Sequence, residues 1–114
     1  QAPQFYYVRE QAEVKAKLFK QALSDIDIAI YLAPDETSFK AEKASLQLRL
    51  NLISEAMQTA EQCVKEAPDY SDGYLILGLA QINSGKKEEG LANLDKAKNL
   101  GNSQATQLIE KYKK

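Results

Sequence analysis

Apolar residues recur along this chain with two spacings, that of an α-helix and a longer one of 34 residues. The longer spacing relates small and apolar residues in three successive segments. Its members are Ala22, Ala56 and Gly90; Ala29, Cys63 and Ala97; and Leu23, Met57 and Leu91. Pro34 and Pro68 are separated by the same 34 residues. A fixed period of this length predicts three stacked units, each a helical hairpin that buries its apolar face against its neighbours.

Within each unit the apolar positions follow the helical period, and a short turn separates two helices. The predicted helices span residues 4–17 and 19–32, 37–50 and 53–66, and 71–84 and 87–99. Pro34 and Pro68, each followed by an aspartate, close the first two units. Asn51 and Gly85 occupy the same position in the turns of the second and third units, where a left-handed backbone is tolerated.

A last amphipathic segment follows Gly101. Over residues 103–113, Ala105, Leu108, Ile109 and Tyr112 share one face of the predicted helix, while charged side chains occupy the other. This segment is expected to cap the apolar end of the array. The repeats are placed at 3–36, 37–70 and 71–102, with the cap at 103–114, in a single domain over 1–114.

The pattern resembles the tetratricopeptide repeat family over essentially the whole chain. The third unit carries the resemblance most fully, with residues at family spacing: Tyr74, Leu77, Gly78, Ala80, Gly90, Leu94 and Ala97. Glu10, Lys40 and Asn102 depart from the family pattern. The resemblance implies an all-α fold, a right-handed superhelix of three helical hairpins with a C-terminal capping helix.

The resemblance also implies a ligand groove, lined by the first helix of each hairpin. Read by register, the candidate groove residues are Tyr7, Gln11, Lys15, Ser45, Arg49, Leu75, Leu79, Ile82 and Asn83. Leu75, Leu79 and Ile82 have the spacing of anchors for a bound peptide. The alternative is that the capping helix and the neighbouring hairpins cover these three side chains.

Some members of the family bind the acidic C-terminal tail of heat-shock chaperones through lysine, arginine and asparagine side chains. The corresponding positions here carry Tyr7, Gln11, Glu42, Asp72 and Ile76. Glu42 and Asp72 would repel an acidic ligand. The expected partner is therefore a protein or peptide other than these acidic tails.

Consecutive aromatic and apolar residues near the N-terminus form a second candidate surface. One helix cannot bury Phe5, Tyr6, Tyr7 and Val8 on a single face. Phe5, Tyr6 and Val8 are a possible association edge, which would make a homo-oligomer or dock a larger partner. The alternative is partial burial against Leu18, Phe19 and the second helix.

The composition of the chain argues against several classes of function. The 114 residues carry a net charge of -1, which argues against nucleic acid as a partner. The chain has no histidine and a single cysteine, Cys63, at a packing position, so neither a catalytic nucleophile with its base nor a metal site is expected. No cofactor and no small-molecule substrate are expected. The sequence thus predicts a non-catalytic protein–protein interaction scaffold, or alternatively a structural, self-associating module.

The two ends of the sequence suggest a location. The chain starts with Gln1, Ala2 and Pro3 rather than methionine, as a product of signal-peptide removal or a trimmed chain would. Residues 105–112 resemble the cap of small repeat proteins of bacterial cell envelopes. We therefore expect a bacterial envelope or periplasmic location in preference to the cytoplasm.

Overall fold

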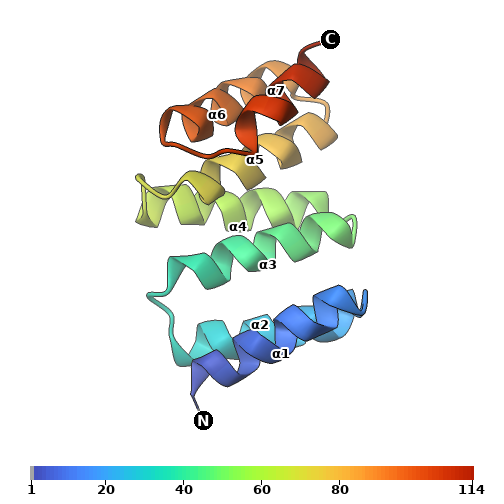
Figure 1. The fold of residues 1–114 in the computed structure, drawn as a ribbon, viewed down its shortest axis with the longest axis vertical. Helices are drawn as coiled ribbons and strands as arrows, with labels where there is room; N and C mark the ends of the chain where they lie inside the picture. Colours follow the sequence, from blue (N-terminus) through green and yellow to red (C-terminus); the bar gives the residue numbers. More distant parts are fainter. Residues whose placement is uncertain (1) are drawn as a thin grey trace.

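The computed structural model describes residues 2–114, and Gln1 with the expectation placed on it lies outside them. Seven α-helices follow one another along the long axis of the molecule (Figure 1). Their bounds are Pro3–Lys15 (α1), Phe19–Leu32 (α2), Thr37–Arg49 (α3), Ile53–Glu66 (α4), Ser71–Asn83 (α5), Lys87–Asn99 (α6) and Ala105–Lys113 (α7). The expectation of an all-α helical repeat is confirmed. No helix in residues 2–114 has the length and apolar character needed to cross a membrane.

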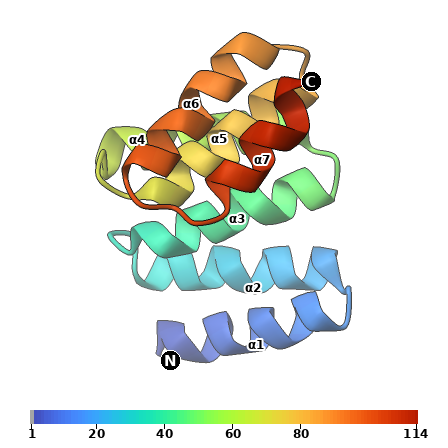
Figure 2. The same cartoon turned by 45° about the horizontal axis from the view of Figure 1, so that its top comes forward.

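Consecutive helices pack as hairpins, α1 with α2, α3 with α4 and α5 with α6, and the second helix of each hairpin contacts the first helix of the next. Figure 2 shows α7 lying across the third hairpin. Its Ala105, Leu108 and Ile109 pack into an apolar cluster with residues of α5 and α6. The expected capping role of this last helix is therefore confirmed.

The turn inside each hairpin uses one left-handed residue at the same register. Lys17, Asn51 and Gly85 have φ values of 60°, 63° and 90°. In the first turn the Leu18 N–H donates to the Glu13 carbonyl at 2.8 Å, and the Lys17 N–H donates to the Val14 carbonyl at 2.9 Å. This is the hydrogen-bond pattern of a Schellman motif. The expectation for Asn51 and Gly85 is confirmed. The expectation of a helix over 4–17 is wrong at Lys17, which lies in the turn.

Small residues at the 34-residue period set the distance between helices. Ala22 and Ala56 are completely buried. A Cβ atom at Gly78 would lie 2.7 Å from the Gly90 carbonyl oxygen, so α5 and α6 approach where neither has a side chain. Cys63 is buried as a small apolar residue, as expected. Burial raises the pKa of its thiol to about 11, so the sulfur stays protonated at neutral pH.

The cap starts two residues later than expected. Asn102 turns the chain first, because its Oδ1 accepts a hydrogen bond of 3.0 Å from the Gln104 N–H. Its Nδ2 donates to Asp72 Oδ1 at 2.9 Å, which ties the loop to the start of α5. Side-chain bonds of asparagine to nearby backbone favour a turn over a helix, so α7 begins only at Ala105.

Candidate functional site

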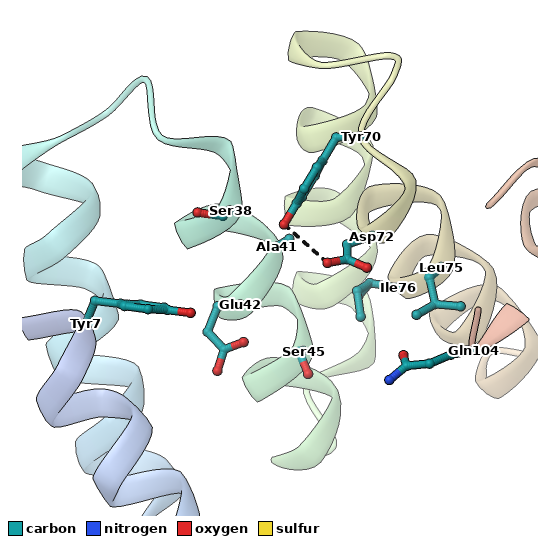
Figure 3. Close-up of a pocket in the computed structure, with 10 residues that line it drawn as sticks. All are labelled: Tyr7, Ser38, Ala41, Glu42, Ser45, Tyr70, Asp72, Leu75, Ile76 and Gln104. Carbon is teal, nitrogen blue, oxygen red and sulfur yellow. Dashed lines mark hydrogen bonds between the residues drawn. The ribbon is translucent and has the colours of Figure 1, made fainter. Parts of the chain in front are cut away.

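A hollow of about 220 Å³ opens between the first helices of the three hairpins. Figure 3 shows the ten side chains around it. They are Tyr7 from α1; Ser38, Ala41, Glu42 and Ser45 from α3; Tyr70 from the turn before α5; Asp72, Leu75 and Ile76 from α5; and Gln104 from the turn before α7. We call this the groove pocket.

Two carboxylates give the groove pocket its charge. Asp72 accepts hydrogen bonds from the Tyr70 hydroxyl at 3.2 Å and from Asn102 Nδ2 at 2.9 Å. Glu42 Oε2 accepts from Gln11 Nε2 at 3.2 Å. All of these donors are neutral, and within residues 2–114 no lysine or arginine forms a salt bridge with Glu42 or Asp72.

A third carboxyl group, that of Glu10, lies behind Glu42. Glu10 is 0% exposed, and its Oε1 accepts a hydrogen bond of 2.7 Å from Gln11 Nε2. Its Oε2 is buried without a donor. Burial, followed by the neighbouring carboxylate of Glu42, raises the pKa of Glu10 from 4.5 to about 8. The carboxyl group therefore keeps its proton at neutral pH.

Two tyrosines border the groove pocket. The Tyr7 ring packs against Phe39 with 5.2 Å between ring centroids. Burial, with Glu42 and Glu10 adding to it, raises the pKa of Tyr7. Burial, then the charge of Asp72, raises the pKa of Tyr70 to about 12. Both phenols are therefore neutral hydrogen-bonding groups at neutral pH.

The structure divides the expected groove residues into three sets. Tyr7 and Ser45 line the groove pocket, and Gln11 bridges Glu10 and Glu42 at its edge. Lys15, Arg49 and Asn83 are exposed in the last turns of α1, α3 and α5, outside the pocket lining. The Arg49 guanidinium instead lies 5.5 Å from the centre of the Phe19 ring.

The third set is Leu75, Leu79 and Ile82, of which Leu75 also lines the groove pocket. Leu75 is only 4% exposed, and it belongs to the apolar cluster that includes Ala105 of α7. Leu79 and Ile82 are half-buried and pack against the same cluster. The third hairpin and the cap therefore cover much of this stripe, and its use as a row of peptide anchors stays a prediction.

Ser38, Tyr70 and Gln104 line the pocket but are not among the residues expected from the register. Tyr70 and Gln104 precede α5 and α7, so a search confined to helix faces passes over them. They are nevertheless 34 residues apart, as the repeat requires of equivalent positions. Extending the period to the turns would have found both.

The expected association edge is partly covered. Phe5 and Val8 are 51% and 65% exposed, whereas Tyr6 is half-buried against the core of the first hairpin. Arg9 lies over the Phe5 and Tyr6 rings, 5.3 and 5.4 Å from their centres. Phe39, one repeat after Phe5, is 3% exposed. Phe5 thus occupies a position that the next repeat buries.

Residues 2–114 contain no group of three or more histidine, cysteine, aspartate or glutamate side chains arranged to hold a metal ion.

Comparison with known proteins gives relatives with the same repeat. The chain is 27% identical over 95 residues to small glutamine-rich tetratricopeptide repeat-containing protein 2 of Saccharomyces cerevisiae, covering 83% of this chain and 28% of that protein. It is 33% identical over 67 residues to tetratricopeptide repeat protein 33 of Xenopus laevis, covering 59% of this chain and 26% of the relative. The chain thus spans about a quarter of each relative's length. No family model matches it.

Solved structures share the fold. The first tetratricopeptide repeat domain of Spaghetti (RPAP3), bound to the HSP90 peptide SRMEEVD, has a TM-score of 0.89 at 19% identity, with 99% of this chain and 91% of that one covered. The TPR2B domain of yeast Sti1, in a complex with an Hsp70 peptide, has a TM-score of 0.87 at 17% identity, with coverage of 96% and 91%.

These likenesses correct two expectations. Domains of this fold do bind HSP90 and Hsp70 peptides, so the exclusion of acidic chaperone tails as partners was wrong. A bacterial origin is not supported, since both curated relatives are eukaryotic. The 34-residue register, the stacked hairpins and the solved structures together show that the chain has the fold of a tetratricopeptide repeat domain, and its curated relatives carry the same repeat.

Proposed function

We propose that this chain is a non-catalytic protein-interaction module that binds a peptide segment of a partner protein in its concave groove. The groove pocket carries the proposal, because it is an open, polar hollow formed jointly by all three hairpins and the start of the cap. The complexes of similar domains with HSP90 and Hsp70 peptides support this class of ligand.

The size and lining of the pocket favour a peptide over a small-molecule substrate. Its volume of about 220 Å³ is below the roughly 300–1,000 Å³ of small-molecule sites. One side chain fits in such a space, while the rest of an extended segment lies along the groove. Ser38, Ser45 and Gln104 offer hydroxyl and amide groups to the peptide backbone.

The test is a selection of peptides from a phage-displayed random library on the parent chain and on Ser45→Arg. Ser45 is half-buried in the pocket lining, so a long side chain there fills the hollow. Gln58→Arg is the matched control, since it adds the same side chain at an exposed position of α4.

Peptides enriched on the parent and on Gln58→Arg, but not on Ser45→Arg, support groove binding. Equal enrichment on all three proteins refutes the groove assignment. No enrichment on the folded parent refutes peptide binding itself. Circular dichroism melting of each variant verifies that the array is intact.

A second candidate function is a structural role in which the chain self-associates through Phe5 and Val8. Both side chains are exposed, and Phe39, the equivalent of Phe5 in the next repeat, is buried, which favours this role. Sedimentation analysis of the parent and Val8→Lys tests this role. An oligomer that the substitution dissociates supports self-association, and a parent that stays monomeric at high concentration refutes it.

A further inference from the structure

From the charge and shape of the groove pocket, we infer that it binds a basic side chain, lysine or arginine, of the partner peptide. The cation would lie between Glu42 of α3 and Asp72 of α5, beside the Tyr70 ring (Figure 3). This inference rests on the proposed peptide binding and specifies the chemistry of the ligand.

The carboxylates of the groove pocket lack counter-ions. Elsewhere in residues 2–114, three acidic side chains have cationic partners: Asp25 pairs with Arg9, Asp27 with Lys43 and Glu66 with Lys40. Glu42 and Asp72 receive only neutral hydrogen bonds. Two carboxylates on facing helices without a cation leave a local negative potential, which attracts a positive group.

A buried carboxyl group next to the pocket also gives Glu42 no cation. Glu10 is 0% exposed, and its Oε2 has no donor. The Gln11 amide links Glu10 to Glu42 through bonds of 2.7 and 3.2 Å. Because Glu10 keeps its proton at neutral pH, neither Glu10 nor Gln11 provides a counter-ion for Glu42.

The lining of the groove pocket matches a long basic side chain. Ala41, Leu75 and Ile76 provide apolar surface for the methylene stem, while the carboxylates and serines face the charged end. Tyr7 and Tyr70 add aromatic faces, which attract cations. Other rings of the chain already have a cation above them, as Tyr74 has Lys96 at 4.9 Å, but no such contact involves Tyr7 or Tyr70 among the described residues.

The experiment is a titration of the ¹⁵N-labelled chain with capped single amino acids, followed by amide chemical shifts. The probes are N-acetyl-lysine-N-methylamide, its arginine counterpart, the uncharged norleucine counterpart and the glutamate counterpart. We expect the two basic probes to shift the amides of residues 42, 72 and 104 in a saturable way, and salt to weaken the effect.

The double variant Glu42→Gln/Asp72→Asn keeps side-chain size and removes both charges. The double variant should bind the lysine probe with roughly tenfold lower affinity, as the loss of charge-assisted hydrogen bonds predicts. Glu61→Gln, at an exposed position of α4, removes one charge outside the pocket and should leave the affinity unchanged. Thermal melts of both variants verify that each is folded.

Equal shifts from lysine and norleucine, unchanged lysine affinity in the double variant, or tighter binding of the glutamate probe would each overturn the inference. The phage selection distinguishes failure of the cation site from failure of the proposed peptide-binding function. Groove-dependent peptides without basic residues would refute the cation site while leaving peptide binding intact. Saturable lysine binding without any selected peptide would support the cation site and refute the proposed peptide module.

Discussion

Arg9 of α1 holds Asp25 of α2 with two hydrogen bonds, from Nε to Oδ2 at 2.8 Å and from Nη2 to Oδ1 at 2.6 Å. Asp25 is 4% exposed, and the hydrogen bonds from Arg9 lower its pKa. One repeat later, Lys43 of α3 pairs with Asp27 at 2.8 Å. The helix α2 thus presents one carboxylate to the helix before it and another to the helix after it.

We expect Arg9→Met to destabilise the first hairpin more than Lys43→Met does. The first change leaves a buried carboxylate without its cation, whereas the second breaks a pair with both partners partly exposed. Urea unfolding followed by circular dichroism at neutral pH should give a clearly lower midpoint for Arg9→Met and a nearly unchanged one for Lys43→Met. Equal midpoints for the two variants would contradict this account of Asp25.

The stabilisation of the fold by the Arg9–Asp25 pair should also depend on pH. Because the folded-state pKa of Asp25 is lowered, the pair stabilises the fold above the unfolded-state pKa of aspartate. This contribution is lost as the pH falls through the lowered pKa. The difference between the parent and Arg9→Met should therefore shrink in strong acid, and a constant difference would be evidence against the charge pair.

Glu10→Gln should change the pH dependence of stability. The folded-state pKa of Glu10 is raised to about 8 from 4.5, so between these values the unfolded chain has released a proton that the folded chain still holds. Stability of the parent therefore falls as the pH rises from 4.5 to about 8, and the neutral amide removes that slope. Chemical denaturation across this range, with Glu61→Gln as control, measures the slope. A parent and Glu10→Gln with the same slope would show that Glu10 does not hold the proton.

Gly78→Ala should cost about 2 kcal/mol of folding free energy, because overpacking a tight contact typically costs about 1–3 kcal/mol. The added Cβ would meet the Gly90 carbonyl oxygen at 2.7 Å, and a backbone atom inside a helix cannot move aside. Gly73→Ala is the matched comparison, since its nearest neighbour is the Val64 Cγ1 atom at 3.1 Å. That contact can relax, and alanine favours the helix, so Gly73→Ala should be near neutral. Thermal denaturation distinguishes the two, and the reverse order would contradict the close approach of α5 and α6.

Lys17→Gly should stabilise the chain by about 1 kcal/mol, since a left-handed backbone costs an ordinary L-residue about 1–2 kcal/mol. Lys17 has a φ of 60° at the position where the third repeat has Gly85. Asn51→Gly should gain less, because asparagine tolerates this backbone conformation. Urea unfolding measures both. A loss of stability in Lys17→Gly would mean that the lysine side chain contributes more than its backbone strain costs.

Local signals determined most of the helical architecture. The 34-residue register located the hairpins, and Asn51 and Gly85 marked two of their turns because few residues adopt positive φ. The turn at Lys17 was not predicted because lysine does not favour positive φ. The 34-residue register nevertheless places Lys17 at the same position as Asn51 and Gly85. The start of α7 was misplaced because Asn102 forms its turn with side-chain bonds.

The candidate site was predicted only in part. Tyr7 and Ser45 were found because register places them on the inner faces of α1 and α3. Leu75, Leu79 and Ile82 share a helix face, but whether that face is open depends on α7, which the chain brings back over the third hairpin. Helical periodicity reports which residues lie together on a helix, and it does not report what covers them.

The sequence by itself therefore determined the repeat, its helices and the resemblance to the tetratricopeptide repeat family, because period, small residues and turn residues act over a few neighbouring positions. The tertiary structure alone decided which carboxylates have counter-ions and which do not. Arg9 reaches Asp25 from another helix. Glu42 of α3 and Asp72 of α5 instead line one pocket with only neutral donors, and Gln11 links Glu42 to Glu10 of α1. Charge pairing depends on distances of a few ångströms between helices, and these are fixed only when the hairpins pack.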